Sequence, residues 1–265
     1  MHNRDNTGRH TAAPQEPRTE NAVNHIDELA DVQDPVWEWL AADLNCSLTR
    51  STVVQPDPGT CRTALRQLRI TAESRLGAIV LNTGGILLHD RWVRVYGGSG
   101  GGPDGIPGIT EVNRISQPAD PARRPEAGLV VAHDVLGGAF VLNGPEPWSS
   151  GRPGRPGDVI YFCPSTLTWQ TTEMDHDHWL DWLVNGGAAG QYREVLWPTW
   201  RSDTAGLSPR QGMVVHPAPW SAEFKEGYTL PVRRPAPLQV ILDEHVASCV
   251  RLGLPHPGAL GTVRM

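Results

Sequence analysis

The sequence lacks any long hydrophobic run and contains little cysteine. Nowhere do about 18 apolar residues follow one another, the length that a membrane-spanning helix needs, so no membrane contact is expected. The N-terminal residues have no apolar core of the kind that a secretory signal peptide carries. The four cysteines form no Cys-x-x-Cys pair, suit no zinc motif and are interpreted as buried thiols. Together these absences predict a cytoplasmic protein.

A strong positive charge is also missing. The formal net charge is −6, and no basic face is indicated, which argues against nucleic-acid binding. Glycine and proline are plentiful instead, at 28 and 24 residues, and predict many turns and long loops rather than a helix bundle. Ten tryptophans supply large apolar side chains for a core.

Three segments are expected along the chain. Residues 1–24 are polar and carry almost no large apolar side chain, so they are predicted to be a disordered tail. Residues 25–254 are predicted to form a single domain, and residues 255–265 a flexible C-terminus.

Helices are expected towards both ends of this domain, with strands between them. Asp34-Pro35, Asp57-Pro58 and Ser74 precede runs with helical spacing and are typical of helix N-termini. Pro235-Ala236-Pro237 is expected to open a final helix that stops at Gly253. The expected strands are Ile86–His89, Trp92–Tyr96, Leu129–Asp134, Ala139–Asn143, Asp158–Cys163, Leu167–Thr171 and Gly212–His216. This order predicts an α+β fold with a single, mostly antiparallel sheet in the middle of the chain and long Gly/Pro loops.

A glycine-rich stretch at 97–105 matches two functional motifs. Gly97–Gly101 fits the G-x-S-x-G pattern of a nucleophile elbow, and Gly100, Gly102 and Gly105 fit a dinucleotide-binding pattern. Both motifs need a helix directly afterwards, to expose the serine or to hold a phosphate at its N-terminus. Pro103 and Pro107 follow instead, so both matches are interpreted as a loop.

The run at 173–178, Glu-Met-Asp-His-Asp-His, could ligate a divalent metal. The alternative is that Asp175 or Asp177 caps the helix that follows, over His178–Val184. We favour the cap, so no metal and no cofactor is predicted.

Aromatic and basic residues near the C-terminus form the candidate binding set. It consists of Trp197, Trp200, Trp220, Arg233 and Arg234. Tryptophan is enriched where interfaces bind most tightly, and arginine suits an anion or an acidic partner. Packing of the tryptophans and solvation of the arginines is the favoured alternative.

No catalytic residue is predicted. If the protein were an enzyme, His133, Asp134, Asp158 and His216 would be the first to consider, because strand ends often present catalytic groups.

The chain from about Asp27 to Leu254 resembles a known family. The resemblance is carried by the segments LGAIVLNTGGILLHDRWVRVYGGSG, VVAHDVLGGAFVLNG, GDVIYFCPSTLTWQ, WLDWLVNGG, EVLWPTW and RRPAPL. They look like the bacterial proteins grouped as domain of unknown function 2625. This resemblance implies no activity and no functional residues.

A more distant resemblance is to the SUKH superfamily, also called Smi1/Knr4-like. It rests on Asn82–Gly85, Gly137–Asn143, Gly157–Phe162 and Trp179–Leu183. It implies a single-sheet α+β fold and an immunity role, in which the domain binds and neutralises a toxin. We therefore expect a non-enzymatic protein-binding domain with a protein partner such as a toxin. An enzyme of unknown reaction and a small-molecule sensor that uses the Trp-rich C-terminal part are the alternatives.

Overall fold

The computed structural model describes residues 29–30, 32, 36–100, 102, 105–115, 128–227 and 230–264. The expected disordered tail, residues 1–24, lies outside them. The described residues form an α+β fold built around a seven-stranded antiparallel sheet, so the predicted fold class is confirmed.

The large sheet is a meander in which each strand pairs with the next one along the chain. Its strands are β1 (Thr52–Val54), β2 (Gly85–Leu88), β3 (Val93–Tyr96), β4 (Leu129–Asp134), β5 (Ala139–Leu142), β6 (Asp158–Cys163) and β7 (Thr168–Asp175). The apolar runs and the turn residues between them locate these strands correctly, with β7 extending further than its sequence suggests.

One face of the sheet is covered by the C-terminal helix α10 (Leu238–Arg251). Residues paired across the strands share a face, and the pairing places one row of side chains on this side. The row runs Arg94, His133, Ala139, Phe162 and Trp169. The Phe162 ring lies 6.0 Å from the His245 ring of α10, which identifies this as the α10 face.

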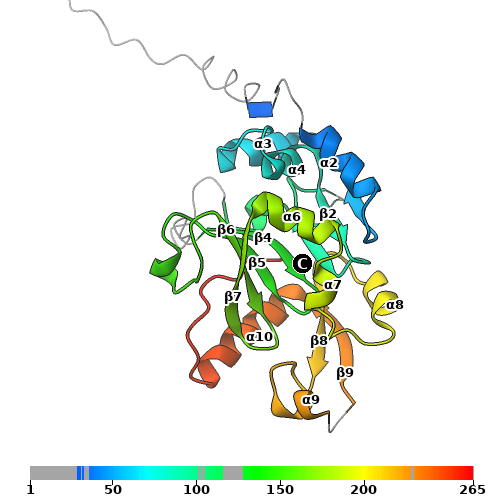
Figure 1. Cartoon of the computed structure of the whole chain (residues 1–265), viewed down its shortest axis with the longest axis vertical. Helices are drawn as coiled ribbons and strands as arrows, with labels where there is room; N and C mark the ends of the chain where they lie inside the picture. Colours follow the sequence, from blue (N-terminus) through cyan, green and yellow to red (C-terminus); the bar gives the residue numbers. More distant parts are fainter. Residues whose placement is uncertain are drawn as a thin grey trace, which may run out of the picture.

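The opposite face packs against α6 (His176–Val184), because the Phe140 ring of β5 lies 5.3 Å from Trp179. Near α6 lie α2 (Val36–Asn45), α3 (Pro58–Leu68) and α4 (Arg75–Asn82), at the top of Figure 1. The caps predicted at Asp57 and Ser74 form, whereas Asp34-Pro35 lies outside the described residues. Asp57 Oδ1 accepts from the Thr60 amide at 2.9 Å, and Ser74 Oγ accepts from the Gly77 amide at 3.0 Å.

The β2–β3 turn is built without glycine. His89, Asp90 and Arg91 all have positive φ, at 52°, 52° and 70°. This conformation is unfavourable for side chains with a Cβ and needs support from its surroundings. Helix α8 (Trp200–Ala205) supplies it, since Arg201 Nε donates to Asp90 Oδ2 at 2.9 Å and Thr204 Oγ1 donates to Asp90 O at 3.1 Å.

After α8 the chain forms a second, two-stranded sheet. Its elements are β8 (Gln211–His216), α9 (Ala222–Glu226) and β9 (Val232–Pro237), which we term the β8–β9 arm because they project from the body in Figure 1. The last helix begins directly after Pro235-Ala236-Pro237, as expected, and Pro237 is its N-cap residue, although the three residues themselves belong to β9. Proline fixes φ and disfavours helix in the residue before it, which suits the edge of a small sheet.

The chain after α10 packs against the body, whereas residues 255–265 were expected to be a flexible C-terminus. Residues 254–264, which we term the C-terminal strap, run back over the α10 face of the sheet (red in Figure 1). Leu260 and Val263 are 3% and 0% exposed. These two apolar anchors explain the difference, because their burial fixes a segment that has no secondary structure. Within the described ranges, no helix is long and apolar enough to span a membrane.

Candidate functional site

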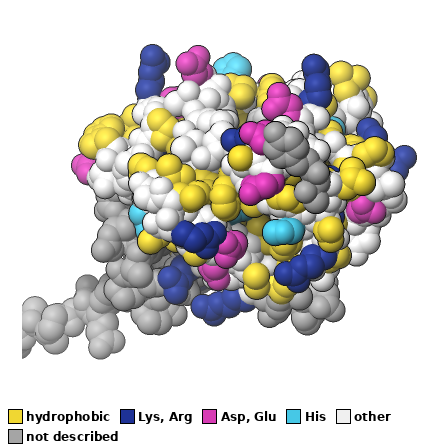
Figure 2. Space-filling model, turned by 90° about the horizontal axis from the view of Figure 1, so that it is seen from below, with side chains coloured by type: hydrophobic (Ala, Val, Ile, Leu, Met, Phe, Trp, Pro, Cys, Tyr) yellow, Lys and Arg dark blue, Asp and Glu magenta, His cyan; other side chains and the backbone are white. Residues whose placement is uncertain are grey.

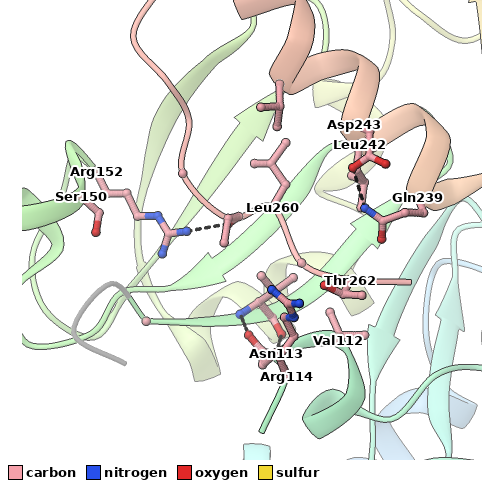
Figure 3. Close-up of a pocket in the computed structure, with 16 residues that line it drawn as sticks. Val112, Asn113, Arg114, Ser150, Arg152, Gln239, Leu242, Asp243, Leu260 and Thr262 are labelled. Carbon is pink, nitrogen blue, oxygen red and sulfur yellow. Dashed lines mark hydrogen bonds between the residues drawn. The ribbon is translucent and has the colours of Figure 1, made fainter. Parts of the chain in front are cut away.

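A pocket of about 380 Å³ lies between α10, the C-terminal strap and the sheet (Figure 3). Sites for small molecules start at roughly 300 Å³, so its size is compatible with a ligand. Side chains that can form hydrogen bonds line it from several elements. They are Asn113 and Arg114 after α5 (Ile109–Val112), Ser150 and Arg152 at and after η2 (Pro147–Ser150), Gln239 and Asp243 of α10, and Thr262 of the strap.

Arg152 forms one wall of this pocket. Its Nη2 donates to Ala259 O at 2.8 Å, and its guanidinium lies 4.9 Å over the Trp169 ring. Burial lowers the pKa of Arg152 to about 10, so it remains cationic at neutral pH. Asp243 lies on the other side (Figure 3), where it accepts from Gln239 Nε2 at 2.8 Å. The pocket therefore presents a cation and a carboxylate on opposite walls.

His133 lies beneath the pocket, under the strap. Its Nε2 is 2.7 Å from Leu260 O, and its Nδ1 is 2.5 Å from the Tyr96 hydroxyl. A carbonyl can only accept, so Nε2 carries the proton and Nδ1 accepts from Tyr96. Burial lowers the pKa of His133 to about 4, which keeps the ring neutral. His133 thus fixes the strap to the sheet.

Arg94, the next residue in the row, is a cation inside the fold. It is 1% exposed, and its Nη1 has no hydrogen-bond partner among the described residues. Burial lowers the pKa of Arg94 to about 10, while the nearby charge of Asp134 favours its protonated form. The two opposite charges partly offset each other within the core.

Asp134 closes the turn between β4 and β5. Its Oδ1 accepts from the amides of Leu136 and Gly138 at 2.8 Å and 2.9 Å, and its Oδ2 accepts from the Tyr161 hydroxyl at 2.6 Å. Burial raises the pKa of Asp134, and these donors oppose that increase. Tyr192 lies close enough to lower this pKa, but within the described part of the chain its hydroxyl has no hydrogen bond of normal geometry.

The four residues singled out as possible catalytic groups do not converge. His133 and Asp134 are consecutive in β4 and point to opposite faces of the sheet. Asp158 Oδ2 accepts from the Arg155 amide at 2.8 Å, and His216 is exposed at the end of β8. In the described part of the chain, no hydrogen bond joins any two of the four. The buried members have structural partners, which gives them a role in the fold.

The candidate binding set separates into two groups. Trp197 and Trp200 are 5% and 4% exposed, and each ring lies 5.5 Å from the ring of Trp92. They belong to an aromatic cluster that fastens α8 to the sheet, which agrees with the packing alternative.

The other three members lie on or beside the β8–β9 arm. Trp220 is half-buried, Arg234 is exposed, and the Arg233 guanidinium lies 4.7 Å over the Trp197 ring. The arm thus connects to the aromatic cluster through Arg233. A binding role for the set stays a prediction.

The glycine-rich stretch at 97–105 and the run at 173–178 were both interpreted as structural. Their residues have packing or capping contacts. Gly98 passes so close to Cys61 that a Cβ at this position would overlap it. At the other motif, Asp175 caps α6 by accepting from the His178 amide at 2.9 Å. Among the described residues, no group of three potential ligands could hold a metal ion.

Sequence reasoning missed the pocket and its principal residues. Arg152 lies in a Pro/Gly loop, and the strap lies in the segment that was expected to be flexible. Neither carries a motif, because their association depends on contacts such as Arg152 with Ala259, which are 107 residues apart.

Comparisons with known proteins give relatives without an assigned activity. A family model described as "Protein of unknown function DUF2625" matches residues 26–239. The uncharacterised protein YbfG of Escherichia coli is 30% identical over 206 residues, covering 75% of this chain and 86% of YbfG. An uncharacterised protein of Haemophilus influenzae is 27% identical over 194 residues, covering 72% and 81%. No solved structure matches. The likeness to the SUKH superfamily stays a prediction.

Proposed function

The chain belongs to the DUF2625 family, whose description assigns no function, and we propose from the geometry of the structure that it is a non-enzymatic binding domain. Its binding site is the pocket between α10, the strap and the sheet. The supporting observation is that the pocket has a suitable volume and a mainly apolar lining into which several polar side chains converge. His133, which lies under the strap, is already paired with Tyr96 and with the strap backbone.

The ligand is a small polar molecule that carries an anionic group. Arg152 offers a positive charge that remains at neutral pH, and this charge attracts a carboxylate or phosphate group in the pocket. Asp243 and Gln239 on the opposite wall can accept from hydroxyl or ammonium groups of the same ligand.

A matched pair of substitutions on α10 tests this site. Val246→Trp fills the pocket, whereas Val240→Trp adds the same ring at a position that is 54% exposed. Melting temperature is measured with a panel of amino acids, dicarboxylates and sugar phosphates. At least one compound should raise the melting temperature of the wild type and of Val240→Trp, but not of Val246→Trp. If all three proteins respond alike to every compound, the pocket is not the site.

A second candidate function is the binding of a protein partner, such as a toxin, by the β8–β9 arm. The observation that favours it is exposed apolar surface, since Leu230 and Val232 are 90% and 66% exposed. Figure 2 views the molecule from this end and shows hydrophobic side chains across the face, with charged ones among and around them. Trp220, Arg233 and Arg234 then serve as neighbouring contacts.

Protection of cells that express a co-encoded toxin tests this function. The wild type should protect, and Leu230→Asp should abolish protection. Val250→Asp is the control, because Val250 is 63% exposed on α10 and lies outside the arm. Equal protection by the wild type and both variants would exclude the arm as the contact surface.

A further inference from the structure

The C-terminal strap is held mainly through its backbone. Its carbonyl oxygens accept from side chains of the body at four residues. The donors are Trp169 Nε1 to Pro257 at 3.0 Å, Arg152 Nη2 to Ala259 at 2.8 Å, His133 Nε2 to Leu260 at 2.7 Å, and Arg210 Nη1 to Arg264. Its amides are held as well, since Thr262 donates to Val112 O at 2.9 Å and Val263 donates to Gln239 Oε1 at 2.8 Å.

The strap crosses the sheet rather than joining it as a strand. It meets Trp169 on β7 first, then His133 on β4, and then the end of α5 at Val112. Its backbone therefore relies on these partners instead of on a ladder of strand pairs. Contacts to backbone groups do not depend on the side chains of the bound segment, so they fit any peptide whose backbone follows the same path.

Specificity comes from two side chains of the strap. Leu260 and Val263 are three residues apart and are buried to 3% and 0% exposure. Gly261 lies between them with a φ of 101°, and a Cβ there would lie 3.0 Å from the His133 ring and from Val112. The surface under the strap, which we term the groove, therefore fits a four-residue pattern. This pattern is an apolar residue, a glycine, any residue and a second apolar residue.

All six residues that hold the strap lie in the segment that matches the DUF2625 model, residues 26–239. The strap itself lies entirely after that segment. The groove and its occupant are therefore separate parts of the chain. If the strap leaves, the buried donors of His133, Arg152 and Trp169 lose their acceptors and need a new one.

We propose that this surface is a binding groove for a peptide segment with the backbone path of the strap and that the strap occupies it in cis. The partner is a protein segment with the pattern Leu-Gly-x-Val or a close apolar equivalent, and it displaces the strap. This inference does not depend on a ligand in the pocket. Tethering gives the strap a high effective concentration, so a partner in trans binds weakly until the strap loosens.

Full-length variants with a loosened strap test the proposal. Leu260→Ala removes one anchor, and Leu252→Ala is the control, because Leu252 is 47% exposed just after α10. Val263→Ala gives a second loosened variant, paired with Val250→Ala, where Val250 is 63% exposed. The probe is a fluorescent peptide with the sequence of residues 254–264, LPHPGALGTVR, and its affinity is measured by anisotropy.

We expect the peptide to bind the two loosened variants about tenfold more tightly than the wild type and both controls. The same peptide with Asp in place of both anchors should not bind. In hydrogen exchange, excess peptide should accelerate the Thr262 and Val263 amides of the wild type, because the strap is displaced. Folded Leu260→Ala and Val263→Ala proteins that bind the peptide no better than the wild type would overturn the proposal. Unchanged exchange at saturating peptide would also overturn it.

Discussion

The hydroxyl of Tyr161 and the carboxylate of Asp134 form a buried hydrogen bond of 2.6 Å that joins β6 to the β4–β5 turn. The same carboxylate accepts from the backbone amides of Leu136 and Gly138. A single side chain thereby fixes both the conformation of the turn and its position on the neighbouring strand.

Removal of this hydroxyl should destabilise the protein. Tyr161→Phe leaves a buried acceptor with one donor fewer, and hydrogen bonds to charged groups contribute about 1.5–3 kcal/mol. Tyr192→Phe is the control, because that hydroxyl lies nearby but has no hydrogen-bond partner of normal geometry among the described residues. Urea denaturation should show the larger loss for Tyr161→Phe. Equal losses would mean that Asp134 does not need the Tyr161 donor.

A methyl group at Gly138 should disrupt the same network. A Cβ there would overlap Asp134 Oδ2 and the Tyr161 hydroxyl, so Gly138→Ala should cost about 3 kcal/mol or more. Gly190→Ala is the matched control, since no atom lies within 4 Å of the added methyl. That change should be neutral or stabilise by a few tenths of a kcal/mol, roughly the helix preference of alanine. Thermal unfolding of the two variants measures the contrast.

Trp169 should stabilise the packed position of the strap, whereas an exposed tryptophan should not. Trp169→Phe removes the donor to Pro257 O and part of the ring, with an expected loss of about 1–2 kcal/mol. Trp148→Phe makes the same change at a residue that is 64% exposed and should have little effect. Limited proteolysis should cleave Trp169→Phe near its C-terminus faster than Trp148→Phe. Identical cleavage of the two would contradict the role assigned to Trp169.

The neutral state of His133 should make stability depend on pH. Its pKa is about 4 in the fold and about 6.5 in the unfolded chain, so the unfolded chain binds more protons between these values. The contribution of His133 to the free energy of unfolding is therefore fully present above pH 6.5. It is lost as the pH decreases towards 4, by on the order of 3 kcal/mol. The raised pKa of Asp134 acts in the opposite sense. His133→Gln should reduce the pH dependence in urea titrations from pH 7 to pH 4, and an unchanged slope would contradict this assignment.

The sheet was predictable from sequence because its strands carry local signals. Leu129–Asp134 and Asp158–Cys163 are apolar runs bounded by turn residues, and Asp57 and Ser74 cap their helices as expected. The start of the final helix after Pro235–Pro237 was also predictable, but the strand that these residues form was not, because only pairing with β8 creates it.

The candidate site could not be predicted in this way. The pocket depends on Arg152, α10 and the strap meeting over the sheet, and no local pattern encodes contacts between segments so far apart. The strap was expected to be flexible because prolines and glycines dominate its composition. Its order depends on just two apolar side chains, Leu260 and Val263, and on acceptors that any backbone carries.

The strictly sequential order of β1 to β7 has a consequence for biosynthesis. Each strand can pair with its predecessor as soon as it leaves the ribosome, because no strand waits for a distant partner. Helix α10 and the strap follow this sheet in the chain, so they emerge after the strands that they cover. Until then, neither segment can cover the row from Arg94 to Trp169.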